Sequence, residues 1–358
     1  MSVSYNPEFD PTGIEGGIDT NTMPWIEIKQ APGMRFKPLR ASRESGWFSM
    51  IVQVEAGTEL PTTVFLGGTD MMILSGRLRY TKGALAATVG PGIWGYIPAN
   101  SRVEGIVVEE TTEYQANYFG PVAFLGEDGK SIDSILTALD VLAATNTNGL
   151  TLVPNSLAEC MQPRPAPFHG EPEPLAIAES EALGEVLQSN EIPEEDAFTH
   201  PHWVDTRPIP WIEFPGMDDY GIKILRVSEE TMMSTLLVLH NSVAGPHYHL
   251  GAADFLVLNG AIGYRAGPPE GYGPGVWFYE PAGARHEATQ RVGDEDLIYT
   301  ANVYGPVQFD EGIGTPIAAV VSWMSYKEMA DANDAPLVAN IFPGDSSLLA
   351  WSPIGNSA

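Results

Sequence analysis

The spacing of apolar residues along the chain predicts a few helices within a mainly β protein. Apolar side chains recur at helical spacing over residues 135–146, 175–188 and 322–334, and we expect a helix in each segment. The 37 glycines and 30 prolines are more than a helical protein needs, but they suit a chain with many tight β connections. The pattern therefore favours short strands joined by turns.

The order of apolar and polar residues repeats once along the chain. LGGTDMMILSGRLRY at 66–80 recurs as LGAADFLVLNGAIGY at 250–264, and GPGIWGYIPANSRVE at 90–104 recurs as GPGVWFYEPAGARHE at 273–287. The shift between matching segments stays between 183 and 186 residues, so the copies differ only by short loop insertions. Two copies at one long period indicate a duplicated domain and not a solenoid of short repeats.

Composition excludes several classes of function. The formal net charge is −28, which makes nucleic-acid binding through phosphates untenable. No apolar run reaches the length of a membrane span, and the N-terminus lacks the basic and apolar regions of a signal peptide. One cysteine allows no intrachain disulfide. We expect a cytoplasmic protein with no membrane partner, whose apolar C-terminal tail favours a homo-oligomer, a dimer or larger.

Three histidines of the second copy are the strongest chemical signal. His247 and His249 form an H-x-H pair, and alternation along a strand would place both imidazoles on one face, with Tyr248 on the other. His286 follows a run of Gly275, Pro281 and Gly283. Three neutral imidazoles suit Fe(II), Zn, Ni or Cu better than Mg or Ca. We expect one divalent metal per chain, for which Fe(II), Zn, Ni and Mn are all candidates.

The first copy has lost these ligands. Alignment on Asp70 and Asp254 places Thr63, Phe65 and Val103 where the second copy has His247, His249 and His286. One hydroxyl and two apolar side chains cannot bind a transition metal. We expect the first copy to be a structural half.

The two histidine blocks resemble the paired motifs of the cupin superfamily. PWIEFPGM, the G-x-x-H-x-H block and YEPAGARHE resemble a group of ChrR-like domains, acetylacetone dioxygenase and 2,4'-dihydroxyacetophenone dioxygenase, over roughly residues 205–310. The resemblance implies an all-β bicupin: two tandem jelly-roll-like β-barrels with a few connecting helices. The expected parts are a barrel without metal ligands, an acidic helical and Pro-rich connector, a metal-binding barrel, and a C-terminal helix with its tail, at 1–130, 131–199, 200–325 and 326–358.

The resemblance also implies roles for other side chains. Glu280, six residues before His286, would support the site by hydrogen bonding, and Arg265 and Thr289 would lie beside the substrate. Asp254 stands where the usual motif has a glutamate ligand. Because the first copy also has an acid there, we expect Asp254 not to be an essential ligand. Ala244 replaces a bulkier pocket residue, as does Ala301, which indicates a different substrate from that of the diketone-cleaving members.

The leading functional hypothesis is an Fe(II)-dependent dioxygenase. It would use O2 to cleave a C–C bond in a small diketone, hydroxyketone or aryl ketone bound as an enolate. Two alternatives remain open: a Zn- or Ni-dependent isomerase, lyase or hydrolase on the same site, and a non-enzymatic metal or ligand sensor. The remaining histidines we interpret as structural, namely His169, the pair His200 and His202, and His240. The matched tryptophans of the two copies indicate core packing.

Overall fold

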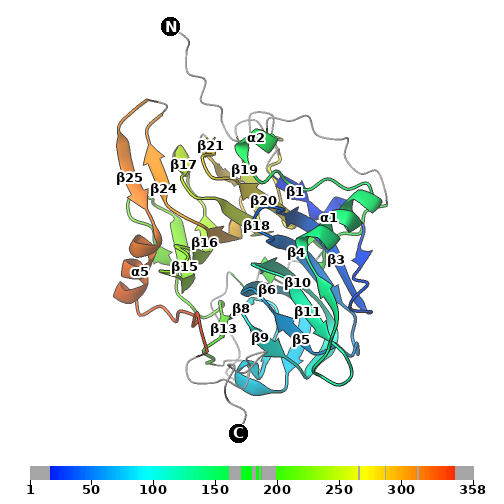
Figure 1. Cartoon of the computed structure of the whole chain (residues 1–358). Coiled ribbons are helices and arrows are strands. Elements are labelled where there is room, and N and C mark those ends of the chain that lie inside the picture. The colour runs from blue at the N-terminus through cyan, green and yellow to red at the C-terminus, as the bar shows by residue number, and fades with distance from the viewer. Residues whose placement is uncertain are drawn as a thin grey trace.

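The structure is a computed structural model that describes residues 17–160, 171–179, 183–184, 187, 199–264, 267–286, 288–312 and 314–342, with only the backbone of His286. Two similar β-sandwiches lie side by side, and each consists of one large and one small antiparallel sheet (Figure 1). The sheets are not closed into continuous barrels. The predicted mainly β, two-copy architecture with few helices is confirmed.

The first sandwich carries an eight-stranded sheet in the order β13-β8-β6-β10-β4-β3-β2, with β7 paired to β6. Its small sheet has the order β12-β11-β5-β9. The strands are β2 (Ile26–Glu27), β3 (Met34–Ala41), β4 (Phe48–Val54), β5 (Thr63–Phe65), β6 (Thr69–Tyr80), β7 (Ala87–Val89), β8 (Ile93–Ile97), β9 (Ser101–Val103), β10 (Ile106–Tyr118), β11 (Val122–Leu125), β12 (Ile132–Leu136) and β13 (Trp203–Asp205).

The second sandwich repeats this plan. Its large sheet has the order β1-β20-β18-β23-β16-β15-β14, and its small sheet the order β21-β17-β24-β25, while β19 pairs with β22. The strands are β1 (Gly17–Asp19), β14 (Ile212–Glu213), β15 (Tyr220–Val227), β16 (Ser234–His240), β17 (His247–His249), β18 (Ala253–Asn259), β19 (Ala261–Gly263), β20 (Val276–Glu280), β21 (Arg285–His286), β22 (Gln290–Val292), β23 (Ile298–Val303), β24 (Val307–Asp310) and β25 (Ile317–Val321).

The two halves exchange their first strands. β1 precedes the first sandwich in sequence but pairs with β20 of the second, with Gly17 opposite Phe278. β13 precedes the second sandwich but pairs with β8 of the first, with Trp203 opposite Gly95. In both pairs a glycine lies opposite an aromatic residue. The glycine is on the exchanged strand β1 in the first pair and on the receiving strand β8 in the second. The exchange ties the halves together through main-chain hydrogen bonds.

The helices agree in part with the expected segments. α1 (Ala138–Thr147) begins later than residue 135, because Thr137 caps it in a reciprocal capping box with Asp140 and the chain before it belongs to β12. α5 (Trp323–Ala332) falls within the expected 322–334. Of 175–188, the structure describes α3 (Ala176–Glu179) and helical residues at 183, 184 and 187. The short elements are α2 (Leu157–Cys160) and the 3₁₀ turns η1 (Thr20–Thr22) and η2 (Gly83–Leu85).

Three apolar cores hold the molecule together. One fills each sandwich, and a third lies between them and includes buried Trp94 and Trp277, as expected for core packing. The other matched pair, Trp25 and Trp211, is half-buried. The ammonium group of buried Lys37 lies 4.6 Å from the centroid of the Trp25 ring, and that of buried Lys223 lies 4.5 Å from the centroid of the Trp211 ring. Burial lowers the pKa of both lysines to about 8.

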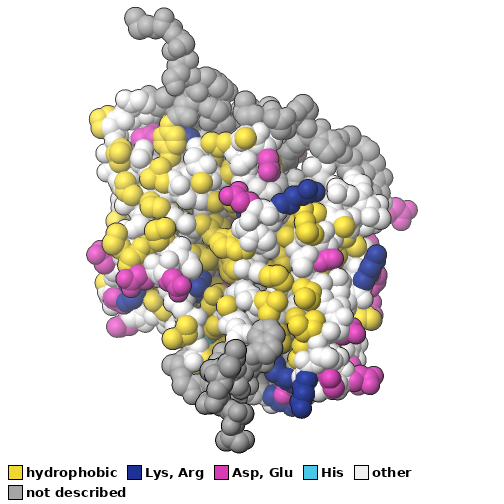
Figure 2. Space-filling model, in the orientation of Figure 1, with side chains coloured by type: hydrophobic (Ala, Val, Ile, Leu, Met, Phe, Trp, Pro, Cys, Tyr) yellow, Lys and Arg dark blue, Asp and Glu magenta, His cyan; other side chains and the backbone are white. Residues whose placement is uncertain are grey.

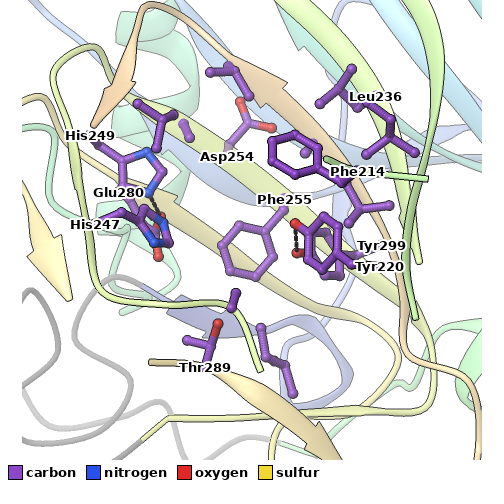
Figure 3. Close-up of a pocket in the computed structure, with 18 of the residues that line it drawn as sticks. Phe214, Tyr220, Leu236, His247, His249, Asp254, Phe255, Glu280, Thr289 and Tyr299 are labelled. Atoms are coloured by element: carbon purple, nitrogen blue, oxygen red, sulfur yellow. Dashed lines mark hydrogen bonds and ion pairs between the residues drawn. The ribbon is translucent and has the colours of Figure 1, made fainter. Parts of the chain in front are cut away.

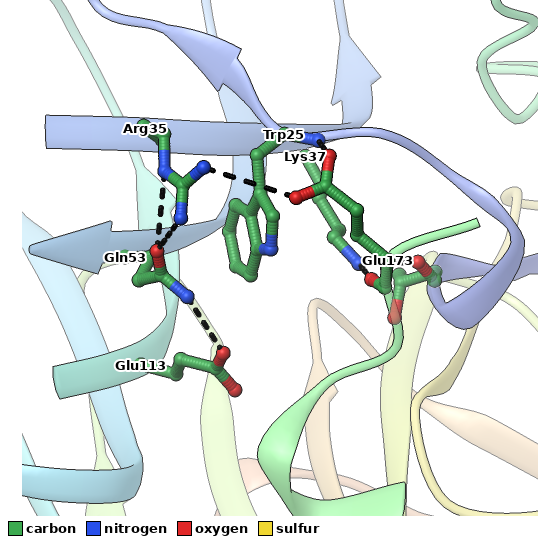
Figure 4. A network of polar contacts seen from close by, with 7 residues as sticks. Trp25, Arg35, Lys37, Gln53, Glu113 and Glu173 are labelled. Carbon is green, nitrogen blue, oxygen red and sulfur yellow. Dashed lines mark hydrogen bonds and ion pairs between the residues drawn. The ribbon is translucent and has the colours of Figure 1, made fainter. Parts of the chain in front are cut away.

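The connector between the halves is anchored to the first sandwich (Figure 4). Glu173 accepts a hydrogen bond from the main-chain N–H of Trp25 at 3.1 Å, and its other oxygen lies 3.8 Å from Arg35. Glu113 accepts from the Gln53 amide at 3.0 Å and from the main-chain N–H at the start of α3 at 2.8 Å. These contacts hold the described part of the connector along the large sheet.

The surface combines a strong negative charge with exposed apolar positions. Figure 2 shows hydrophobic side chains over the middle of this face and in the region of β24 and β25, where Ile317 and Val320 are exposed. Self-association stays a prediction. Among the described residues, no helix combines the length and the apolar character that a membrane crossing needs.

Candidate metal and substrate site

The two histidines of the H-x-H pair lie side by side at one wall of the second sandwich. Both are on β17, both are buried, and their ring centroids are 5.0 Å apart. Tyr248, between them, is less buried, as strand alternation predicts. His286, on β21, pairs in register with His247, because the turn through Gly283 (φ +86°) returns the chain beside β17. The backbone thus brings all three predicted ligand positions together.

Hydrogen bonding fixes the chemical form of one imidazole. His247 Nδ1 lies 2.8 Å from the carbonyl oxygen of Gly245, which can only accept, so Nδ1 is the donor. The neutral ring then carries its lone pair on Nε2, as metal-binding histidines do. This observation, together with the clustering of imidazoles, fits a borderline divalent metal.

Glu280 lies against the H-x-H pair and not in solution. It is the last residue of β20, it is buried, and its Oε2 lies 2.6 Å from His249 Nε2. Its other carboxylate oxygen accepts a hydrogen bond from the Tyr264 hydroxyl at 3.0 Å. Glu280 therefore contacts His249 of the first motif. The sequence pattern had associated it with His286, and the role assigned to it stays a prediction.

Beside the histidines is a cavity of about 100 Å³ in the interior of the second sandwich (Figure 3). An apolar cavity of comparable size, about 150 Å³, holds benzene, so this space suits a small organic molecule. Thr289 lines the cavity and is held by paired main-chain hydrogen bonds to Ala244, which also lines it, as does Ala301. The apolar wall includes Phe214, Ile222, Leu236, Val238, Phe255 and Phe309.

Asp254 has partners on the side of the interface between the halves. Its carboxylate accepts hydrogen bonds from the Asn302 amide, at 3.3 Å, and from the Tyr304 hydroxyl. Asp70, at the matching position of the first copy, accepts from Asn117 at 2.9 Å. Burial, followed by the nearby charge of Asp254, raises the pKa of Asp70 to about 8, and burial raises that of Asp254 to about 6. Whether Asp254 binds a metal stays a prediction to be tested.

Three polar residues of this sandwich were not expected to contribute. Tyr220 and Tyr299 line the cavity, their hydroxyl oxygens lie 3.3 Å apart, and His240 Nδ1 lies 3.2 Å from the Tyr299 hydroxyl. The sequence showed only an isolated histidine, because its partner is 59 residues away.

Arg265 lies outside the described residues. Strand pairing supports the alignment of the first copy, since Thr63 lies opposite Val103 as His247 lies opposite His286.

Comparison with known proteins supports the duplicated fold. One family model, the ChrR cupin-like domain, matches residues 15–123 and again residues 199–306, which confirms both the repeat and the predicted resemblance. No curated protein matches the chain. A Nostoc punctiforme protein provisionally described as a dioxygenase is 14% identical, with a TM-score of 0.50, over 86% of this chain and 85% of its own. Similarity at this identity supports the two-domain fold alone.

Two other similar solved structures have lower TM-scores. An acetylacetone dioxygenase from Acinetobacter johnsonii is 20% identical, with a TM-score of 0.31, over 40% of this chain and 90% of its own. Oxalate decarboxylase from Bacillus subtilis is 14% identical, with a TM-score of 0.46, over 92% of this chain and 87% of its own.

Proposed function

Because the chain belongs to the family of ChrR cupin-like domains, we propose that its second half is an Fe(II)-dependent dioxygenase. Its substrate would be a small diketone, hydroxyketone or aryl ketone, in which a C–C bond beside a carbonyl is cleaved. The proposal is supported above all by the buried cluster of His247, His249 and Glu280 at the wall of an apolar cavity. The first half has no such cluster among its described residues.

In this proposal His247, His249 and His286 hold one metal ion per chain. When bound, the ion supplies Lewis acidity towards the substrate oxygens and redox reactivity towards O2. The Gly245 carbonyl oxygen keeps the His247 ring in its ligating tautomer. The Glu280 carboxylate, whose Oε2 lies 2.6 Å from His249 Nε2, would support the site by orienting the His249 ring.

The cavity wall supplies the other requirements of the reaction. Apolar side chains exclude water from the bound enolate, and Thr289 places a hydroxyl group at the cavity wall. We assign Arg265 to charge balance of the enolate, on the strength of the family resemblance alone. A small cavity favours a compact substrate over a polymer or a large cofactor.

The test measures metal content and O2 uptake on the same preparation. Protein from its native host, analysed for metals, should contain one iron per chain and should consume O2 with at least one member of a panel of small diketones and hydroxyketones. His249→Ala should lose both metal and O2 uptake. Thr63→Ala is the matched control, since Thr63 occupies the position of His247 in the first copy.

Two outcomes would contradict the proposal. Zinc or nickel at full occupancy with no O2 uptake would favour the isomerase, lyase or hydrolase hypothesis. Two metal ions per chain, with one lost in Thr63→Ala, would show that the first half is also a metal site.

A further inference from the structure

Two hydrogen-bonded tyrosines, Tyr220 and Tyr299, line the cavity at the end away from the histidines, and His240 extends their hydrogen-bonded chain behind Tyr299. Figure 3 shows Phe255 between the two ends, with His247, His249 and Glu280 on one side and the hydroxyls of Tyr220 and Tyr299 on the other. His240 is buried behind Tyr299, with its Nδ1 3.2 Å from that hydroxyl and its ring centroid 5.0 Å from that of Tyr220. The apolar cavity thus has a second polar end.

Both tyrosines are neutral hydroxyl groups at ordinary pH. Burial raises the pKa of Tyr220 and, more strongly, that of Tyr299, and the negative charge of Glu280 acts in the same direction. A neutral hydroxyl can donate one hydrogen bond and accept two. Neither group can therefore serve as an anionic ligand, and their chemistry towards a bound molecule is hydrogen bonding.

The hydrogen bonds that link His240, Tyr299 and Tyr220 can be donated in either direction along this chain. If His240 Nδ1 carries the proton, it donates to Tyr299, Tyr299 donates to Tyr220, and Tyr220 can donate to a ligand carbonyl. If Nδ1 accepts, each hydroxyl points back towards the histidine, and the oxygens of the tyrosines can accept from a ligand hydroxyl. The tautomer of His240 thereby adapts this end of the cavity to either kind of oxygen.

The hydrogen-bonded group of Tyr220, Tyr299 and His240 is specific to the half that carries the histidine cluster. In the first sandwich Met34 pairs with Val54, in the register in which Tyr220 pairs with His240 in the second. Tyr299 does have a counterpart in Tyr114, which pairs with Val52 as Tyr299 pairs with Val238. Polar side chains at the positions of Tyr220 and His240 are thus present only in the sandwich with the predicted metal ligands. A tyrosine at the position of Tyr299 is present in both sandwiches.

We propose that Tyr220 and Tyr299, oriented by His240, form a subsite for a second oxygen of the substrate, remote from the oxygens that face His247 and His249. The substrate class is then a small ketone that carries a hydroxyl or carbonyl group at its far end. This inference rests on the proposed function, since it takes the histidine end as the place where the reacting carbonyl binds. Tyr220 and Tyr299 are binding residues, and His240 is a positioning residue.

The test compares two ligands of equal size on the metal-loaded protein without O2. Heptane-2,4-dione and 6-hydroxyhexane-2,4-dione have the same number of heavy atoms and differ by a terminal methyl against a terminal hydroxyl. Calorimetric titration should show the hydroxylated ligand binding more tightly to the wild type. Tyr299→Phe and Tyr220→Phe should each weaken its binding by about 3- to 10-fold, the usual effect of one neutral hydrogen bond, and leave the affinity for heptane-2,4-dione unchanged.

Two further variants separate a specific effect from a general loss of packing. Tyr114→Phe removes the matching hydroxyl from the first sandwich and should change neither affinity. His240→Asn keeps a hydrogen-bonding side chain behind Tyr299 and should retain part of the preference, whereas His240→Leu should lose it.

The outcomes distinguish this inference from the proposed function. Equal binding of both ligands to the wild type, or a preference that survives both tyrosine substitutions, would overturn the subsite and leave the dioxygenase proposal standing. If neither diketone binds to metal-loaded protein, the proposed function fails and the subsite fails with it.

Discussion

The exchanged strand β13 provides a stringent test of how the two halves are held together. Trp203 is buried against Tyr80, with ring centroids 4.9 Å apart, and its indole N–H donates to the Leu85 carbonyl oxygen at 3.1 Å. Gly95 lies directly opposite on β8, and a Cβ atom there would lie 2.0 Å from the indole ring. We therefore expect Gly95→Ala to displace Trp203 and loosen β13.

The expected cost follows from what the displacement removes. Deleting a buried tryptophan side chain costs about 3–5 kcal/mol, and Gly95→Ala should approach that range because the indole cannot keep its position. For a chain of 358 residues that unfolds as one unit, the melting temperature should fall by roughly 4–7 °C. The assay is urea unfolding followed by far-UV circular dichroism and tryptophan fluorescence. Gly90→Ala is the matched control, since its Cβ would lie 3.6 Å from the nearest atom, the Gly76 carbonyl oxygen, an ordinary contact.

A double-mutant cycle isolates the contact itself. Trp203→Ala alone should destabilise the protein strongly, and adding Gly95→Ala to it should cost almost nothing, since no indole remains to collide with the new methyl group. The reasoning is refuted if Gly95→Ala is as mild as Gly90→Ala, or if the two substitutions add without coupling.

Three further substitutions test single residues. Glu280→Gln should retain most of the metal but slow turnover by about 10- to 100-fold, with metal content and O2 uptake measured on one preparation; unchanged turnover would make the contact with His249 irrelevant. Asp254→Asn should keep its metal, because the carboxylate faces Asn302 and Tyr304; metal loss as complete as in His249→Ala would make it a ligand. The pKa of Asp70 in the folded protein is about 8, above its ordinary value of 3.8. Between these two pH values the folded protein binds one more proton than the unfolded chain. Its free energy of unfolding therefore falls as pH rises, by at most about 1.4 kcal/mol per pH unit. Asp70→Asn should therefore flatten the decline in urea midpoint from pH 5 to pH 9, and an unaltered slope would argue against the raised pKa.

The duplication could be predicted because it is a local pattern, and the three histidines that the same patterns select as ligands stay a prediction, although the backbone brings their positions together. An H-x-H pair on a strand fixes the face of both imidazoles, and the matching segments place Thr63 at the position of His247 in the first copy, as the strand pairing supports. The same comparison associated Asp254 with Asp70, an acid present in both copies. The structure offers a physical explanation for an acid at this position in both copies, because the two carboxyl groups lie near each other at the interface between the halves.

The remaining features depend on pairings that no local pattern reveals. Strand exchange joins Gly17 to Phe278 and Trp203 to Gly95, residues more than 100 positions apart. His240 appeared isolated in the sequence because Tyr299 reaches it only across two neighbouring strands of a sheet. Long-range register is set by the complete fold and cannot be inferred from alternation along one strand.

The half without the predicted metal ligands still helps to shape the half that carries them. Gly17–Asp19 pair with β20, the strand that ends at Glu280. Just beyond them, the Thr20 hydroxyl donates to the Gly275 carbonyl oxygen at 2.7 Å, and the Asn21 amide donates to that of Pro274 at 2.8 Å. These bonds fix the turn from which β20 begins, while Ala253 of β18 pairs with Glu280 on the other side. The first copy therefore supports the position of Glu280, since a carboxylate 2.6 Å from His249 can orient an imidazole only if its own strand is held in register on both edges.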